Sequence, residues 1–494
     1  MNKLNIKELI RDYLKGEKIE IKFQYPSDDV VLMINSLLSL ILTRADLVYI
    51  LDTIITIVRE LIFNSVKSNA KRIYFHKLNL NINDDFDYNS TIKNFKKQII
   101  NNFDLIKKDL SNSSYTVTVS MINQNDELNI IIENNTSLLP IEEERISHRK
   151  EVALECENFT EAYDKYYDST EGAGLGIILS VLLLKNAGIE GDRYYVESEK
   201  GYTRTYLKIP YNTQPIEITS LIKNEILEEV HTLPTFPENI IELRNMCDDP
   251  TVTIDEIAKK VLLDPSLTAD VLRLSNSAGF VYAKRIETIE EAIKVIGLKN
   301  FVAVLSTTAA RHILDKRYQK FEDVWNHCNK IAFYSKKIAD FTGKNRIAEQ
   351  AALSGLLHDI GKIVLLSLKP DLISKIHEVT QKRKIRVSSI MEEITIGISH
   401  SEIGSILAEK WNFPQYITDA IRHHHSPLKV PKENRDIVSI VYLANMLSGI
   451  ETNKYTLGYI DSVILENFNL TDRNQLLSLS KDLKESYQSR VNIS

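Results

Sequence analysis

Residues 351–362 read Ala-Ala-Leu-Ser-Gly-Leu-Leu-His-Asp-Ile-Gly-Lys, and this stretch decides the fold of the C-terminal half. Its apolar residues recur at helical spacing, so it is predicted to be a helix with an apolar face. The helix ends in His358 and Asp359, and Gly361 is predicted to cap it. An imidazole and a carboxylate are common ligands of divalent metals. The stretch therefore indicates a helical domain with a candidate metal site.

Three further histidine segments lie on separate predicted helices of the same half. His327 comes before the stretch, His400 opens a helix over residues 400–410, and His423-His424-His425 closes another helix. The cores of helix bundles commonly bring ligands together from facing helices. A lone histidine is more often a packed or surface residue. Four histidine segments within about a hundred residues instead favour a shared site.

This pattern resembles the HD superfamily of metal-dependent phosphohydrolases, and is closest to its HDOD subfamily of signalling and interaction domains. The HDOD resemblance rests on Leu233–Pro237, Asp264–Ala278 and Thr288–Phe301. It covers residues 224–450 and implies an all-α fold with a divalent metal such as Fe, Mn or Zn. Lys362 would be a catalytic acid or electrostatic helper. The implied metal ligands are His327, His358, Asp359, His400, His423 and His424.

One position departs from the superfamily pattern and leaves the chemistry open. The last metal ligand of the superfamily is an Asp on a late helix, and Asn445 stands at the matching place. Because an amide is a weak and uncharged ligand, a two-metal centre would lose one anionic ligand. The Gly-Tyr-Pro element of cyclic-di-GMP phosphodiesterases is also absent after Lys362.

The N-terminal half has a different pattern, which predicts an α/β fold. Five short runs are rich in β-branched and aromatic residues and are predicted to be strands, with helical patterns between them. These runs are Arg72–Leu80, Tyr115–Met121, Leu128–Glu133, Arg193–Glu197 and Arg204–Ile209. From about residue 223 onward the apolar rhythm is almost entirely helical, so the second half is predicted to be all-α.

A polar face marks a predicted helix over residues 52–71. Glu60, Asn64 and Lys67 share this face, and their oxygens and ammonium would suit Mg²⁺ and phosphate. The alternative is the solvated face of a surface helix, which is the more common case. The run Gly172-Ala-Gly174-Leu-Gly176 favours a phosphate site, because glycines let backbone N–H groups approach a phosphate closely.

Together these residues resemble the GHKL ATPase family, which includes histidine kinases, gyrase-type ATPases and anti-sigma kinases. The resemblance implies a Bergerat-type α/β sandwich that binds ATP with Mg²⁺. Glu60 would be catalytic, and Glu133 stands where the family has the Asp that receives the adenine amino group. The implied nucleotide-binding residues are Asn64, Lys67, Glu133, Gly172, Gly174, Gly176 and Thr203.

Composition narrows the class of protein further. The formal net charge is −6 over 494 residues, so there is no footprint of a nucleic-acid binder. The three cysteines form no Cys-x-x-Cys pair, so a cysteine-based zinc site is not supported. No signal peptide is recognisable, and the most apolar stretch near the start, Val30–Leu42, is too short to span a membrane. These features predict a cytoplasmic protein with no membrane partner, and the two family resemblances imply a bacterial one.

The sequence is predicted to be organised in five segments. They are a helical lead-in (1–39), the GHKL-like domain (40–212), a linker (213–223), the HDOD domain (224–450) and a helical tail (451–494). Residues 81–114 are predicted to be a surface insertion with one amphipathic helix over Thr91–Leu110.

Three functions stay open at this point. The first is a signalling protein in which the ATP-binding domain regulates an HDOD domain that binds an unknown protein partner. The second is a metal-dependent phosphohydrolase acting on a nucleotide or cyclic nucleotide. The third is a protein kinase of the anti-sigma type that acts in trans. A homodimer is compatible with each.

Overall fold

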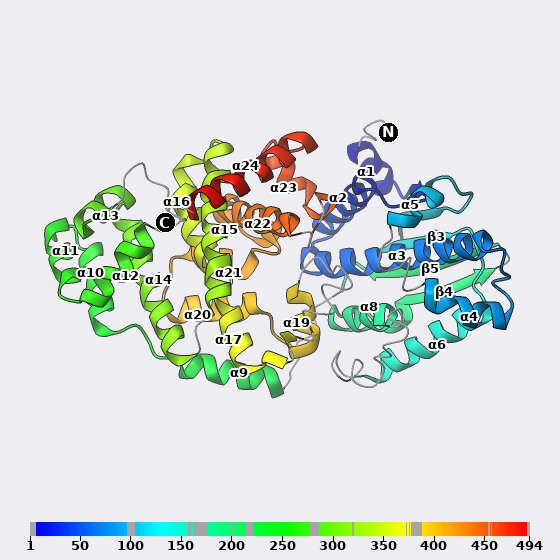
Figure 1. Ribbon diagram of the computed structural model, residues 1–494, viewed down its shortest axis with the longest axis horizontal. Helices are drawn as coiled ribbons and strands as arrows, with labels where there is room; N and C mark the ends of the chain where they lie inside the picture. The colour runs from blue at the N-terminus through cyan, green and yellow to red at the C-terminus, as the bar shows by residue number, and fades with distance from the viewer. Residues whose placement is uncertain are drawn as a thin grey trace. The chain divides into compact units, whose positions relative to one another are not determined.

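The computed structural model divides the chain into two compact units, so the predicted multidomain organisation is confirmed (Figure 1). Unit 1 comprises Met1–Ile218 with Leu457–Ser462, and unit 2 comprises Thr219–Thr456 with Val463–Ser494. The structure describes residues 6–95, 104–156, 161, 175–199, 201–213, 221–276, 286–318, 321–371, 373–374, 376, 388–452, 455 and 457–491. Each unit is treated below by itself.

Unit 1 contains a five-stranded antiparallel sheet with the strand order β1-β2-β3-β5-β4. The strands are β1 (Ile19–Phe23), β2 (Val117–Gln124), β3 (Glu127–Asn134), β4 (Tyr194–Glu199) and β5 (Tyr202–Pro210). Buried and less buried residues alternate along β3, which is the pattern of a sheet with one covered face. The β2–β3 hairpin turns at Asn125 and Asp126, whose φ angles of 58° and 56° these residue types tolerate.

Helices cover this sheet. They are α1 (Ile6–Leu14), α2 (Asp28–Arg44), α3 (Leu51–Lys77), α4 (Asp85–Phe95), α5 (Asp104–Ser111), α6 (Pro140–Glu155) and α8 (Leu175–Asn186). The longest, α3, packs against β2, β3 and α8. Its buried residues Ile54, Val58 and Leu61 share one apolar stripe.

Three details of the predicted secondary structure are wrong. The expected strand Arg72–Leu80 is mostly the last part of α3. There Ile73 and Phe75 are buried in the core of unit 1. The helical lead-in 1–39 also contains a strand, β1, which pairs with β2. The single helix expected over Thr91–Leu110 is replaced by α4 and α5, and residues 96–103 between them lie outside the described part of the chain.

Unit 1 is completed by a segment from far along the chain, residues 457–462. The short 3-10 helix η6 (Leu457–Tyr459) packs against α2, where the Asn35 amide donates to the Gly458 carbonyl over 2.8 Å. Ser39 donates to the Asp461 carboxylate over 3.2 Å. The Arg59 guanidinium lies 3.6 Å from the centre of the Tyr459 ring. These contacts fix the segment as a part of unit 1.

Unit 2 is helical, as predicted from its apolar rhythm. Its helices are α9 (Leu221–Thr232), α10 (Glu238–Asp248), α11 (Ile254–Leu262), α12 (Pro265–Ser275), α13 (Ile289–Ile296), α14 (Leu298–Arg317), α15 (Glu322–Phe341), α16 (Ala348–Leu357), α17 (Ile360–Leu368), α19 (Ser388–Ile396), α20 (His400–Lys410), α21 (Gln415–His423), α22 (Lys432–Glu451), α23 (Ser462–Asn467) and α24 (Arg473–Val491). Local signals set several helix starts: Thr253 and Glu256 form a capping box before α11, and Asp264 caps α12.

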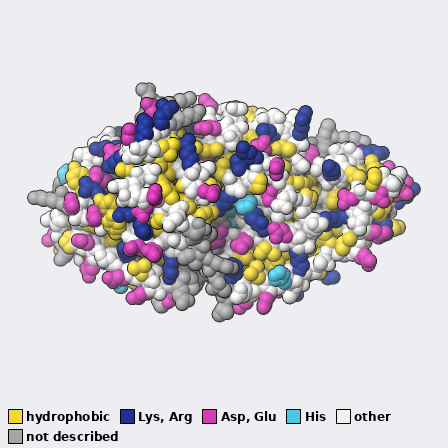
Figure 2. Space-filling view, turned by 180° about the vertical axis from the view of Figure 1, so that it is seen from behind, with side chains coloured by type: hydrophobic (Ala, Val, Ile, Leu, Met, Phe, Trp, Pro, Cys, Tyr) yellow, Lys and Arg dark blue, Asp and Glu magenta, His cyan; other side chains and the backbone are white. Residues whose placement is uncertain are grey.

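One helical stretch of the described residues, Asn345–Leu368, is long and apolar enough to cross a membrane. However, 78% of its apolar window is buried inside the protein, as in a core helix. On the face drawn in Figure 2, Lys and Arg side chains are interspersed with Asp and Glu. That face therefore shows no single-sign patch of the kind that binds nucleic acid.

A half-buried ion pair joins α3 to α6 in unit 1. The Lys71 ammonium lies 2.5 Å from one Glu142 oxygen, and the Arg72 guanidinium lies 3.4 Å from the other. The backbone N–H of Leu139 donates to the same carboxylate over 3.0 Å. Burial raises the pKa of Glu142, but the two cations outweigh it and hold the pKa below its ordinary value.

The substitution Glu142→Gln should destabilise unit 1 by about 2 kcal/mol, because two cations lose their charged partner. A lowered carboxylate pKa stabilises the fold above the unfolded pKa, and this contribution is lost as the pH falls through the folded pKa. The difference in the free energy of unfolding between wild type and variant should therefore be largest at neutral pH and should decrease in acid. Hydrogen exchange with mass spectrometry on α3 and α6 peptides measures it. Glu143→Gln, at an exposed neighbour, is the control and should match the wild type.

Candidate metal centre and nucleotide pocket

The histidine segments of unit 2 converge because five helices pack around one point. Helix α15 packs on α16, α17 packs on α20, and α21 packs on both α16 and α20. His358 ends α16 and Asp359 begins α17, so the link between two buried helices carries both side chains. His400 is the first residue of α20.

The first group of candidate ligands is His327, His358 and Asp359, whose ligand atoms lie within 4.8 Å of one another. One oxygen of Asp359, Oδ2, lies 3.3 Å from His358 Nε2 and 3.6 Å from His327 Nε2. His358 is 0% exposed and Asp359 is 1% exposed, whereas the His327 side chain is 33% exposed. The group is therefore closed on the inside and open at His327.

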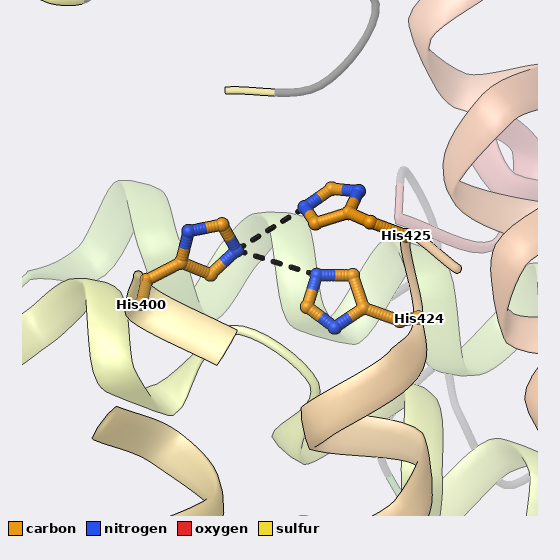
Figure 3. Close-up of side chains that lie close together, drawn as sticks. All are labelled: His400, His424 and His425. Atoms are coloured by element: carbon orange, nitrogen blue, oxygen red, sulfur yellow. Dashed lines mark hydrogen bonds between the residues drawn. The ribbon is translucent and has the colours of Figure 1, made fainter. Parts of the chain in front are cut away.

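The second group is His400, His424 and His425 (Figure 3). His400 Nε2 lies 3.3 Å from His424 Nε2 and 3.2 Å from His425 Nε2. The other oxygen of Asp359, Oδ1, lies 3.3 Å from His400 Nε2 and 3.5 Å from His424 Nε2. One carboxylate thus presents a separate oxygen to each group of imidazoles.

Hydrogen bonds behind the rings orient three of these histidines. The Nδ1 atoms of His358 and His424 lie 2.7 Å and 2.9 Å from the carbonyls of Gly355 and Ile421. His400 Nδ1 lies 2.6 Å from a Glu392 oxygen, which also accepts the His400 backbone N–H. With Nδ1 donating, each Nε2 presents its lone pair to the centre, as metal-binding histidines do.

Two atoms at this centre are buried without a hydrogen-bond partner, and they are both ligand atoms. They are His358 Nε2 and Asp359 Oδ1. Buried polar atoms are nearly always satisfied in proteins, so an orphaned nitrogen and an orphaned oxygen at one point need a partner. Divalent cations next to these two atoms would satisfy them, so the donor set fits a metal.

The charges at the centre favour the ligand forms of Asp359, His424 and His425. Burial would lower the pKa of His400, but the Glu392 carboxylate outweighs burial and raises that pKa. Burial raises the pKa of Asp359, but His358 and Lys362 outweigh it and the pKa lies well below its ordinary value. Burial lowers the pKa of His424 and His425 well below the ordinary value, which keeps these rings neutral. A carboxylate and neutral imidazoles are the protonation states that bind metal.

The structure brings together five of the six ligands predicted from the sequence, and Lys362 contacts the centre through a 2.6 Å ion pair with Asp359. His423 is in neither group, and His425 occupies the place expected for it. Burial, Lys429 and Arg422 lower the pKa of His423 to about 4, so its charged neighbours differ from those of the centre. The run of three consecutive histidines does not show by itself which of its rings face the centre.

Gly361 does not cap a helix as predicted; it lies within α17, in close contact with α20. A Cβ at Gly361 would collide with the His400 carbonyl and would lie 2.6 Å from the Gly404 backbone nitrogen. This close approach sets the spacing between Asp359 and His400. The Glu392 carboxylate behind His400 had no sequence signal, since it lies on a separate helix, α19.

In unit 1, a cavity of about 170 Å³ collects part of the predicted nucleotide site. It is lined by Asn64, Lys67 and Thr203, with Asn134 beside Thr203 across the β3–β5 register. Asn134 is 4% exposed and its Oδ1 has no hydrogen-bond partner. The cavity therefore offers an unsatisfied polar group to a ligand.

The other predicted nucleotide residues are placed differently. Glu133 points to the opposite face of the sheet from Asn134 and binds Arg204 over 2.7 Å. Glu60 is 8% exposed and lies against Gly176, where a Cβ would collide with its carboxylate. Gly172 and Gly174 lie outside the described residues.

The comparisons with known proteins identify the helical domain. Residues 233–427 match the HDOD domain family, so the chain contains an HDOD domain that includes every histidine of both groups. An uncharacterized protein of Treponema pallidum (strain Nichols) is 28% identical over 440 residues, which cover 89% of this chain and 86% of that protein. This similarity extends across both units.

Solved structures resemble about half of the chain. An HDOD domain protein of unknown function from Geobacter sulfurreducens is 27% identical, covering 55% of this chain and 94% of that chain with a TM-score of 0.42. A protein from Shewanella amazonensis, provisionally described as a metal-dependent phosphohydrolase, is 15% identical, covering 54% of this chain and 98% of that chain with a TM-score of 0.38.

The substitution Gly361→Ala should destabilise unit 2 by about 1–3 kcal/mol, because its methyl group meets backbone atoms that cannot rotate away. Both tryptophans, Trp325 and Trp411, lie in unit 2, so urea unfolding followed by tryptophan fluorescence measures the loss. In Gly404→Ala the new Cβ would lie 2.7 Å from Ile421 Cγ2 and 3.2 Å from the Gly361 backbone nitrogen, whereas the Gly361→Ala methyl group collides with a backbone carbonyl, so a smaller loss is expected. A Gly361→Ala protein as stable as the wild type would contradict this account.

Proposed function

We propose that unit 2 is a metal-dependent phosphohydrolase in which Asp359 and the two groups of imidazoles would hold two divalent metal ions. The observation that carries this proposal is the division of the Asp359 oxygens, Oδ2 toward one group of imidazoles and Oδ1 toward the other. His327 and His358 would hold the first ion, and His400, His424 and His425 would hold the second. Three histidines would supply neutral ligands beside Asp359, since Asn445 stands where the superfamily has its last anionic ligand.

The ligand chemistry narrows the choice of metal and reaction. Imidazole and carboxylate ligands suit Fe, Mn or Zn rather than Ca²⁺. Bound ions would lower the pKa of a water molecule and polarise a phosphoryl group. This chemistry supports hydrolysis of a phosphate ester.

The chain's own residues would bind and orient such an ester at the open side of the centre. His358, His400 and His424 are fully buried, whereas the side chains of His327 and Lys362 are 33% and 27% exposed. The Lys362 ammonium is held by Asp359, which raises its pKa although burial alone would lower it. Lys362 Nζ would therefore contact a phosphoryl oxygen or hold the proton for a leaving oxygen.

Metal analysis of single variants tests this proposal. The purified wild-type protein should contain about two transition-metal ions per chain, because two ligand groups share one carboxylate. Asp359→Ala should lose both ions and lower bis(p-nitrophenyl) phosphate hydrolysis at least ~100-fold. His425→Ala should lose about one ion. Elemental analysis and the hydrolysis rate are the measurements.

The adjacent His423 provides the control. His423→Ala should keep the full metal content, since this ring is in neither group. Circular dichroism confirms that each variant is folded. A wild-type protein that carries no stoichiometric metal after growth with Fe, Mn and Zn would rule the proposal out.

A second candidate function is adenine-nucleotide binding in unit 1, which the GHKL resemblance implies. It is favoured by Asn64, Lys67 and Thr203 lining one cavity. Asn134 would take the role expected of Glu133, with its free Oδ1 accepting the adenine amino group. The cavity of about 170 Å³ is below the ~300 Å³ typical of ligand pockets, so it suits the base rather than the whole nucleotide. ATP control of the HDOD domain and kinase activity in trans stay predictions from the sequence.

A thermal shift assay with ATP and Mg²⁺ distinguishes the two adjacent residues. ATP at about a hundred times its Kd should stabilise the wild-type unit by ~2.7 kcal/mol. Asn134→Ala should abolish the shift, because it removes the acceptor in the cavity. Glu133→Ala should preserve it, because Glu133 faces the other side of the sheet. The reverse pattern, or no shift in the wild type, would contradict the proposal.

A further inference from the structure

Unit 2 has another cavity, which contains none of the candidate metal ligands. Its volume is about 430 Å³, within the ~300–1,000 Å³ of ligand pockets. It lies among α12, α14, α15 and α16. One face of α14 forms its longest wall, on which polar side chains recur over three helical turns, from Thr307 and Thr308 to Asp315 and Lys316.

The charges of the described residues in this cavity leave one lysine unpaired. Arg273 pairs with Asp270 over 2.5 Å, and Arg311 pairs with Asp315 over 3.4 Å and with Glu322, just outside the lining, over 3.5 Å. Among the residues that the structure describes, Lys316 has no ion pair. Lys316 is therefore the cation of the lining that remains available to an anionic group of a ligand.

A planar cation is held rigidly in the same cavity. The Arg311 guanidinium lies 4.9 Å from the Trp325 ring centre, and Trp325 is 2% exposed. Trp325 Nε1 donates to Asp315 over 3.2 Å, so the ring, the guanidinium and the carboxylate form one connected unit. A guanidinium fixed in this way offers a flat surface on which an aromatic ring stacks.

Two uncharged side chains add hydrogen-bonding capacity. Asn329 lines the cavity one helical turn after Trp325 on α15, and its amide can both donate and accept. Thr308 Oγ1 donates to the Val304 carbonyl over 2.9 Å, which leaves its lone pairs for a ligand donor. Paired donors and acceptors of this kind match the edge of a heterocyclic base better than they match an inorganic ion.

We infer that this cavity binds a ligand of mononucleotide size, with its phosphate at Lys316 and Arg273 and its planar base on Arg311. The volume, the unpaired Lys316 ammonium, the fixed guanidinium and the amide of Asn329 each match one part of such a ligand. None of its lining residues belongs to the two groups of candidate metal ligands or to the lining of the unit 1 cavity.

Calorimetric titration of the full-length protein with GMP tests this inference. GMP should bind with one-to-one stoichiometry, and guanosine or inorganic phosphate alone should bind at least ~10-fold more weakly, since each keeps only part of the contacts. Lys316→Ala and Asn329→Ala should each weaken GMP binding about 10-fold, from opposite walls of the cavity. Both positions are at least partly exposed, so these variants should fold.

Lys294→Ala is the matched control, because it removes one exposed positive charge from unit 2 outside the cavity. The GMP affinity of Lys294→Ala should stay within about twofold of the wild-type value, since a single charge outside the cavity contributes little to affinity. The titration is repeated with EDTA, and GMP binding should persist whether or not the protein holds metal.

Three outcomes would overturn the inference. The first is no saturable binding up to about 5 mM GMP. The second is that Lys294→Ala weakens GMP binding as much as Lys316→Ala does. The third is loss of GMP binding in EDTA, which would place GMP at the metal centre. Because the EDTA titration needs no metal, failure of the phosphohydrolase proposal leaves this test unaffected.

Discussion

The Asp359 carboxylate is the constraint on which unit 2 depends. A carboxylate with 1% exposure costs free energy to bury, so its neighbours must compensate the charge. Lys362 does so directly, and imidazoles surround the remaining directions. The helices that supply these groups cannot move apart without leaving a buried anion uncompensated, which explains why α17 and α20 meet at a pair of glycines.

The division between an α/β half and a helical half could be predicted from periodicity, because apolar spacing reflects which face of an element is buried. The strand predicted over Arg72–Leu80 failed for the same reason. In the last turns of α3 the β-branched and aromatic residues pack into a core, and composition alone does not distinguish a buried helix from a strand. The match of residues 233–427 to HDOD domains agrees with the resemblance seen in the sequence.

The finer differences between the predicted and observed site residues have one physical origin, which is a shift in register by one or two residues. Adjacent residues of a strand face opposite sides of the sheet, so Asn134 rather than Glu133 lines the cavity of unit 1. Successive residues at a helix end point about 100° apart, so His425 rather than His423 joins the candidate metal ligands. Motif spacing locates such a segment but does not fix which of its residues faces inward.

The return of residues 457–462 to α2 has a consequence for how the protein is made. Asn35 and Ser39 are nearly inaccessible to water, and their hydrogen-bond partners are Gly458 and Asp461. During synthesis all strands of the unit 1 sheet are translated long before these partners. Since domains usually fold in order during synthesis, this surface of α2 must wait uncovered while most of unit 2 is translated. Unit 1 is thus translated before unit 2 but gains its last segment only after most of unit 2 has been translated.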